Sequence, residues 1–233
     1  ILAREFFQSK EFYNIISNKD IKIVVCSSPY SNIPTATFAL KDYFIAEFNK
    51  KLVEFDLNPV EECKIYRSTS YVKDYGSMSA TERERHISNE DFYIDKFFVK
   101  NKYVIFIDDV KITGSHQRKI ESMIDIQDVN CDYLFMYFAE LCNKDIKPSF
   151  EDYINNFFIK SLLDIDWIIK NDKFIFNTRV VKYILSRSKK EFVNFINYQS
   201  EVFLNTLYKN GISNSYHKNE EFKENLNILK EKV

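Results

Sequence analysis

The amino-acid sequence predicts an α/β protein, with a parallel β-sheet core followed by an all-helical C-terminal extension. Residues 21–26, 103–108 and 131–138 are predominantly apolar runs, which is typical of strands covered on both faces. Segments with helical apolar spacing alternate with these runs, as in parallel sheets. Beyond Pro148 the pattern is helical throughout, so we expect one domain at residues 1–147 and a helical extension at 148–233.

The expected elements follow from the spacing of apolar residues and from helix start signals. A proline favours the first turn of a helix, and Pro34 therefore marks the start of the longest helix in the core. In chain order we expect helix 2–17, strand 21–26, helix 34–52, strand 64–67, strand 103–108, helix 117–123 and strand 131–138.

The extension is expected to contain four or five helices that cover one edge of the sheet. Residues 189–211 place Phe192, Ile196, Phe203 and Leu207 on one stripe, and Gly211 is expected to stop this helix. The last segment repeats the pattern with Phe222, Leu226 and Leu229.

Composition excludes several classes of partner. The 33 basic and 34 acidic residues nearly cancel, so we expect neither nucleic acid nor a membrane as a partner. No apolar run approaches the roughly 18 residues of a spanning helix, and no signal-peptide pattern is found, although the sequence begins at Ile1. The four cysteines lack C-x-x-C spacing, which predicts reduced thiols and a cytoplasmic location.

The segment 104–116, VIFIDDVKITGSH, carries the most specific chemical signal. Asp108 and Asp109 stand at the carboxyl end of a buried strand, where open α/β sheets bind ligands. Ile112, Thr113, Gly114, Ser115 and His116 then form a turn into a helix, whose first N–H groups suit a phosphate. Carboxylates beside a phosphate turn indicate a sugar phosphate, since carboxylates accept hydrogen bonds from hydroxyls. The acids could alternatively hold Mg²⁺ or cap the helix.

The residues upstream of this segment extend the pattern. An Arg-x-Thr, a polar loop, Ser-x-x-Glu-Arg and an aromatic residue precede the two aspartates. This ordered series resembles the phosphoribosyl-pyrophosphate (PRPP) motif of the type I phosphoribosyltransferases, in their ComF-like branch, over about residues 20–140, and it implies their Rossmann-like parallel-sheet fold. The matching residues are Arg67, Thr69, Ser79, Glu82, Arg83, Phe92, Asp108, Asp109, Thr113 and Gly114.

The resemblance implies roles for the acids and the turn. Asp108 and Asp109 would hold the ribose hydroxyls of PRPP and the Mg²⁺ that bridges ribose and pyrophosphate oxygens. Thr113, Gly114 and Ser115 would hold the 5-phosphate. Ile112 and His116 depart from the small polar residues that the family has at these positions, and only the histidine can still donate a hydrogen bond.

The resemblance also implies where the pyrophosphate would bind. Ser28, Tyr30 and Ser31 follow the first sheet strand, although the match is positional only and an ordinary strand-to-helix loop is an alternative. Lys73, Arg83 and Arg85 would neutralise the departing pyrophosphate, and Arg67 at the end of its strand would face the pyrophosphate throughout.

Residues 71–85 correspond to the loop that closes over substrate in related transferases. Ser79 and Glu82 could also, or instead, form a helix capping box in this segment.

Two functions from different classes follow from these expectations. The first is a Mg²⁺-dependent phosphoribosyltransferase that transfers phosphoribose from PRPP to a base-like acceptor and releases pyrophosphate. The second is a PRPP-binding sensor or interaction module without catalysis. ComF-like domains also occur in stress-linked gene clusters that make nucleotide-like metabolites, which implies a nonstandard acceptor. The sequence leaves a homodimer open.

Overall fold

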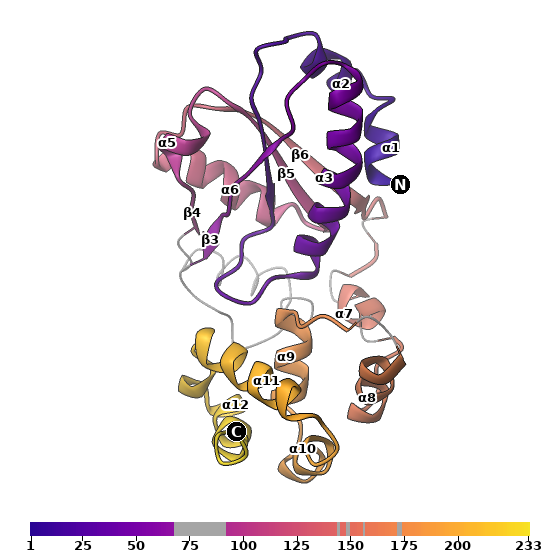
Figure 1. Cartoon of the computed structure of the whole chain (residues 1–233), viewed down its shortest axis with the longest axis vertical. Coiled ribbons are helices and arrows are strands. Elements are labelled where there is room, and N and C mark those ends of the chain that lie inside the picture. Colours follow the sequence, from indigo (N-terminus) through magenta and orange to yellow (C-terminus); the bar gives the residue numbers. More distant parts are fainter. Residues whose placement is uncertain (68–91, 144, 148–149, 156, 172–173) are drawn as a thin grey trace. The chain divides into compact units, whose positions relative to one another are not determined.

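The computed structural model describes residues 1–67, 92–143, 145–147, 150–155, 157–171 and 174–233 (Figure 1). The chain forms two compact units. Among the described residues, the first unit holds 1–29, 36–67 and 92–143, and the second holds 30–35 together with those beyond 144.

The first unit is built on a four-stranded sheet in which all neighbouring strands are parallel. Its order is β2-β1-β5-β6, so β1 and β5 are the inner strands. The expected parallel sheet with flanking helices is confirmed. The strands are β1 (Ile23–Ser27), β2 (Glu61–Glu62), β5 (Tyr103–Lys111) and β6 (Asp132–Glu140).

Helices cover both faces of this sheet (Figure 1). On one face, Val25, Ile105 and Ile107 pack with Phe44 and Phe48 of α3 (Ala36–Glu54), with α1 (Leu2–Phe6) and with α2 (Lys10–Ile16). On the other face, alternate residues of β1 and β5 pack with α6 (Ser115–Ile126) and with residues near α5 (Lys96–Val99). Because side chains alternate across a strand, these predominantly apolar runs supply both cores.

Two expectations for this unit are corrected. Residues 64–67 do not form a strand of the main sheet: β3 (Tyr66–Arg67) pairs antiparallel with β4 (Phe92–Tyr93) in a separate two-stranded sheet, and the main sheet instead takes β2. Residues 2–17 form two helices, because the Ser9 hydroxyl accepts the Phe12 N–H at 3.1 Å and starts a new helix there.

The second unit is helical, which confirms the expected helical C-terminal region. Its core is formed by apolar side chains that include Ile33, Val181, Phe192, Leu207 and Leu226. The described part contains more helices than the four or five expected. They are α7 (Phe150–Asn155), α8 (Leu162–Asn171), α9 (Thr178–Leu185), α10 (Lys189–Ile196), α11 (Glu201–Ser213), the 3₁₀ helix η2 (Tyr216–Lys218) and α12 (Glu220–Lys230).

Gly211 does not stop a helix, contrary to the sequence expectation. The segment 189–211 divides between α10 and α11, because Ser200 caps a new helix by accepting the Phe203 N–H at 3.2 Å. Gly211 lies inside α11, where an added Cβ would lie 2.6 Å from Cδ2 of Leu226. The glycine therefore permits close packing against α12.

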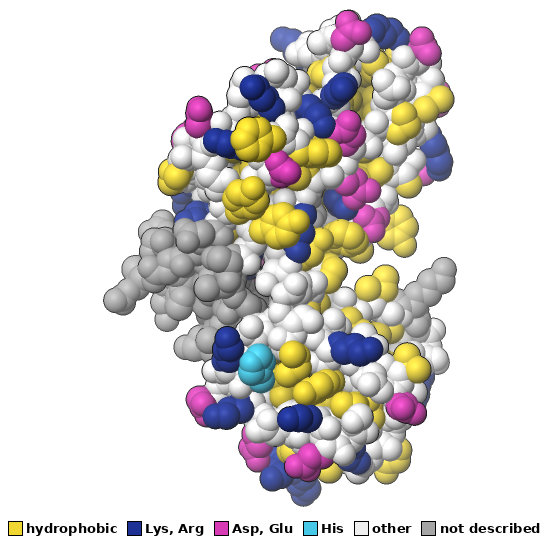
Figure 2. Space-filling model, turned by 60° about the vertical axis from the view of Figure 1, so that its left-hand side comes forward, with side chains coloured by type: hydrophobic (Ala, Val, Ile, Leu, Met, Phe, Trp, Pro, Cys, Tyr) yellow, Lys and Arg dark blue, Asp and Glu magenta, His cyan; other side chains and the backbone are white. Residues whose placement is uncertain are grey.

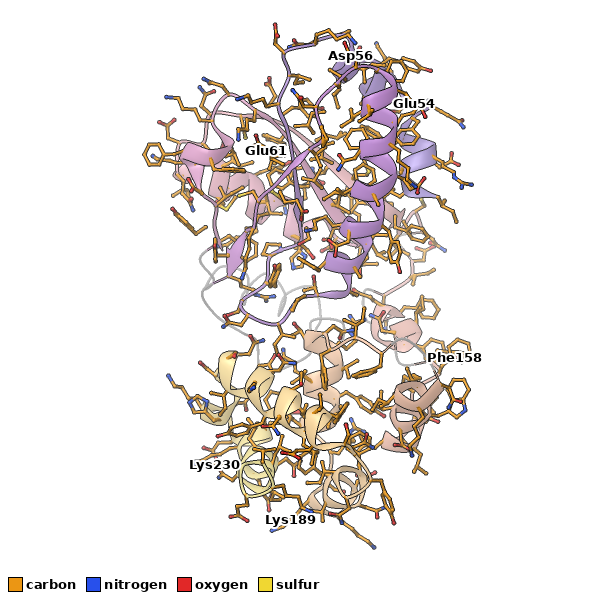
Figure 3. The ribbon with its side chains drawn as sticks, in the orientation of Figure 1. Glu54, Asp56, Glu61, Phe158, Lys189 and Lys230 are labelled. Carbon is orange, nitrogen blue, oxygen red and sulfur yellow. The ribbon has the colours of Figure 1, made fainter. Side chains whose placement is uncertain are left out.

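The surface carries mixed charge. On the face shown in Figure 2, Lys and Arg side chains are interspersed with Asp and Glu over both units. Among the side chains labelled in Figure 3, the acids Glu54 and Asp56 are exposed on the first unit, and Lys189 and Lys230 are exposed on the second. Phe158 is 83% exposed. None of the helices in the described ranges has the length and apolar character needed to cross a membrane.

Candidate functional site

The carboxyl ends of three strands meet at one edge of the sheet. In the parallel register, Ser27 of β1 pairs with Ile107 of β5, and Asp108 of β5 pairs with Tyr137 of β6. β5 extends past both aspartates to Lys111, so the two acids lie within the C-terminal part of the strand and not in the loop after it. This edge is where open α/β sheets place ligand chemistry.

A small cavity of the first unit opens at this edge. Ser28, Asp108 and His116 line it, together with Gln117 and Tyr137. Its volume is about 10 Å³, which is room for roughly one water molecule. The structure therefore brings together residues from the end of β1, the end of β5 and the first turn of α6.

Asp108 is the best-connected polar residue of the cavity. Its Oδ1 accepts the Thr37 hydroxyl at 3.3 Å and the Asp109 N–H at 3.0 Å. Its Oδ2 lies 3.3 Å from Nδ1 of His116. Partners from three elements, α3, β5 and α6, thus fix the orientation of this carboxylate.

The protonation of the site follows from these contacts. Burial alone would raise the pKa of Asp108, but the hydrogen bond and charge of His116 and the Asp109 N–H outweigh burial, so the pKa lies below its ordinary value. Asp108 is therefore ionised at neutral pH. Burial, and then the negative charge of Asp108, raise the pKa of Tyr137, whose neutral hydroxyl donates to Oε1 of Gln117 at 3.2 Å.

The turn before α6 has the geometry of an anion site. Gly114 adopts the left-handed conformation, with φ 70°, and it is the residue immediately before the helix. The hydroxyls of Thr113 and Ser115 share a hydrogen bond of 2.7 Å. Two hydroxyls at the N-terminus of a twelve-residue helix offer donors where the helix dipole favours negative charge.

Arg118 adds a cation to this turn. Its Nη1 donates to the Thr113 carbonyl at 2.8 Å, and its Nη2 donates to the Ser115 hydroxyl at 3.2 Å. The guanidinium therefore lies against the Ser115 hydroxyl and the backbone of Thr113. Arginine suits this place because its planar fork matches phosphate oxygens.

The two aspartates are not equivalent. Neighbouring residues of a strand point to opposite faces, which directs the two carboxylates apart. Asp108 lines the cavity, whereas Asp109 is not among the lining residues and its Oδ1 accepts the Val110 N–H at 2.8 Å. Ile112 is half-buried between the end of β5 and the turn.

The remaining predicted residues lie elsewhere or outside the described ranges. Arg67 ends β3 and pairs with Phe92 in the small antiparallel sheet. Tyr30 and Ser31 belong to the second unit, whereas Ser28 belongs to the first. Six predicted residues lie outside the described residues, as does the predicted loop 71–85: Thr69, Lys73, Ser79, Glu82, Arg83 and Arg85.

Sequence reasoning missed Thr37 and Arg118, although a signal exists for each. Thr37 and Lys41 are polar residues on the buried face of α3, which is otherwise formed by phenylalanine and leucine at i, i+4 spacing. Arg118 lies four residues after Gly114, which is one helical turn and places it beside the start of the helix.

The donors at the strand edge fit Mg²⁺ only if the substrate supplies the remaining oxygen ligands. Among the residues that the structure describes, no cluster of three or more His, Cys, Asp or Glu side chains could hold a metal ion. Mg²⁺ commonly binds through one or two carboxylates together with substrate phosphates. The ionised Asp108, which lines the cavity, fits this mode as a single carboxylate, because the Asp109 carboxylate is directed away from it.

Comparison with protein families decides what kind of protein this is. The family described as PRTase ComF-like matches residues 2–229. The chain belongs to the ComF-like phosphoribosyltransferase family. The match spans the sheet unit and nearly all of the helical unit. The family expectation drawn from the sequence is thereby confirmed.

Solved phosphoribosyltransferases are distantly similar. A structure of adenine phosphoribosyltransferase shares 14% identity with a TM-score of 0.37, covering 60% of this chain and 66% of its own. A hypoxanthine phosphoribosyltransferase from Staphylococcus aureus shares 12% identity with a TM-score of 0.30, covering 60% and 71%. The chain thus spans about two thirds of the length of the first of these proteins. No curated protein sequence matches the chain.

Proposed function

We propose that this protein transfers phosphoribose from PRPP to a base-like acceptor with release of pyrophosphate. Family membership supports phosphoribosyl transfer in general. The observation that carries the proposal is the ionised Asp108 at the carboxyl edge of the sheet, eight residues before His116 at the start of α6 and in contact with it. A carboxylate beside a phosphate turn suits a phosphorylated ribose.

The 5-phosphate would bind at the turn before α6. The Thr113 and Ser115 hydroxyls can rotate to donate to its oxygens, and Gly114 lets the backbone approach closely. Arg118 would neutralise the phosphate charge through the guanidinium that already lies against both residues. Ile112 contributes no donor, so the backbone and Arg118 would carry more of this affinity.

Asp108 would orient the ribose. A substrate hydroxyl could replace the Thr37 hydroxyl at Oδ1, since that hydrogen bond is long at 3.3 Å. His116 would hold the other oxygen and keep the acid ionised. Asp109 is proposed as its companion toward Mg²⁺, and Mg²⁺ bound there would neutralise charge on the pyrophosphate.

The transfer itself breaks the bond between ribose C1 and a pyrophosphate oxygen. Pyrophosphate leaves with the bonding electrons, and a nitrogen of the acceptor forms the new bond to C1 and loses its proton to solvent. Arg67, Lys73 and Arg83 are proposed to stabilise the departing charge, and Ser28, Tyr30 and Ser31 to bind pyrophosphate.

A PRPP sensor without catalysis is the second candidate. It is favoured by the engagement of Asp108 with three partners of its own chain and by the loss of a donor at Ile112. Pyrophosphate release from PRPP, measured with Mg²⁺ across a panel of purines, pyrimidines and amines, separates the candidates. Release that depends on an acceptor and is lost in Asp109→Asn supports the transferase, whereas PRPP binding without release supports the sensor.

We propose a cytoplasmic location, because Cys26, Cys63, Cys131 and Cys142 are free thiols. Homodimer formation stays a prediction, and light scattering of the purified chain tests it.

A further inference from the structure

The segment between β1 and α3 is flanked by site residues but is held by the helical unit. Ser28 lines the cavity at one end of this segment, and Thr37 donates to Asp108 at the other end. Residues 30–35 between them belong to the second unit. We call residues 30–35 the β1–α3 loop.

One side chain of the helical unit accepts two backbone hydrogen bonds from this loop. Oδ1 of Asn214 accepts the N–H groups of Asn32 at 3.1 Å and Ile33 at 3.2 Å. Asn214 is only 4% exposed, and its Nδ2 donates to the Tyr216 hydroxyl at 3.1 Å. In return, Nδ2 of Asn32 donates to the Ser213 carbonyl at 2.5 Å. The amide of Asn214 is thus fixed on both sides.

Thr178 holds the other end of the same loop. Its hydroxyl donates to the carbonyls of Ile33 at 2.9 Å and Pro34 at 3.3 Å, and its N–H donates to Pro34 at 3.1 Å. Ile33 itself is 1% exposed and lies in the hydrophobic core of the helical unit. The backbone of the loop at Asn32, Ile33 and Pro34 is therefore held by α9 and the end of α11.

We infer that Asn214 and Thr178 are positioning residues for pyrophosphate: they fix the β1–α3 loop in the conformation that binds it. This inference rests on the proposed function, in which Ser28, Tyr30 and Ser31 contact pyrophosphate. It also gives the helical extension a role in substrate binding besides covering apolar surface. If the loop adopts the binding-competent conformation only part of the time, its apparent affinity for the ligand falls in proportion to the fraction of molecules in that conformation.

The test measures binding of pyrophosphate and ribose 5-phosphate separately, each with Mg²⁺, by titration calorimetry on the full chain. Asn214→Leu keeps the number and branching of the side-chain heavy atoms but removes the acceptor of two N–H groups, those of Asn32 and Ile33. It should weaken pyrophosphate binding at least fivefold and leave ribose 5-phosphate binding within twofold, since the Thr113–Ser115 turn is built in the first unit. Thr178→Val, which removes one hydroxyl only, should give a smaller loss of the same kind.

Two further variants separate positioning from general destabilisation. Asn214→Asp retains an oxygen for both N–H groups and an acceptor for the Tyr216 hydroxyl, so it should bind pyrophosphate within about twofold of the wild type. Asn225 is the matched control: it is also 4% exposed in the helical unit, and it also makes two backbone hydrogen bonds, in which its Nδ2 donates to the Leu185 and Arg187 carbonyls. Asn225→Leu should lower the melting temperature without selective loss of pyrophosphate.

The outcomes distinguish a failure of the positioning role from a failure of the proposed function. Equal effects of Asn214→Leu and Asn225→Leu on pyrophosphate, or no effect of Asn214→Leu, would overturn the positioning role while the proposed function stands. A wild-type chain that binds neither probe would overturn the proposed function itself, and the inference with it. Selective loss in Asn214→Leu with rescue by Asn214→Asp supports both.

Discussion

Replacing Arg118 with alanine tests the proposed phosphate site at the turn before α6. The guanidinium donates to the Thr113 carbonyl and to the Ser115 hydroxyl, so it is already oriented where a 5-phosphate would bind. A hydrogen bond to a charged group contributes about 1.5–3 kcal/mol when it is shielded from water. Arg118 is exposed, and solvent screening reduces this to about 1–2 kcal/mol.

This free energy corresponds to a roughly 5- to 30-fold rise in the Kd for ribose 5-phosphate or PRPP. Arg118→Lys keeps the charge but loses the planar fork, so it should fall between alanine and the wild type. The loss should shrink at high salt, because screening weakens exposed charges. Titration calorimetry at low and high ionic strength measures these differences.

Lys119 provides the matched control for this prediction. It is the neighbouring cation of α6, and its Nζ lies over the Phe92 ring, 5.9 Å from the centroid, and not at the turn. Lys119→Ala removes the same charge and should change the Kd less than twofold. Equal losses in Arg118→Ala and Lys119→Ala would refute a local phosphate contact and leave only a general charge effect.

Two further predictions concern stability. Because the pKa of Asp108 is lowered in the folded chain, its ionised form stabilises the fold above the pKa of the unfolded chain, and this contribution is lost as pH falls. The difference in unfolding free energy between wild type and Asp108→Asn should therefore shrink below about pH 5; a constant difference from pH 7 to pH 3 would contradict this. Gly211→Ala gains about 1 kcal/mol of helix propensity but places a Cβ 2.6 Å from Cδ2 of the buried Leu226, a clash that costs about 1–3 kcal/mol. The net loss of about 1 kcal/mol should lower the melting temperature by roughly 2–4 °C. A higher melting temperature would show that Leu226 on α12 moves to accommodate the added methyl group.

The sheet could be predicted because its strands carry their own signal. β1 and β5 are buried on both faces in their apolar parts. Their apolar runs are too short for a buried helix, so their length favours strands. β2 carries no such signal: it is two glutamates, and its place in the sheet comes from pairing with Val24 and Val25. The sequence instead predicts a strand of the main sheet at residues 64–67, although Tyr66 and Arg67 pair with β4.

The site was only partly predictable for a related reason. Asp108 and the Thr113–Ser115 turn are local in sequence, so their spacing is informative. Thr37 meets Asp108 across 71 residues, and Asn214 meets Ile33 across 181. Contacts of this range depend on how the elements pack, which residue spacing does not report. Gly211 shows the same limit, because its place inside α11 depends on Leu226 of another helix.

PRPP binding tests the central claim most directly. A ligand that binds only the folded chain, at 100 times its Kd, adds about 2.7 kcal/mol to the free energy of unfolding. PRPP with Mg²⁺ should therefore raise the melting temperature of the wild-type chain by roughly 5–10 °C. The double variant Asp108→Asn, Asp109→Asn keeps the side-chain sizes and removes both charges, so it should show no shift. A wild-type chain whose melting temperature does not move with millimolar PRPP and Mg²⁺ would contradict both the transferase and the sensor.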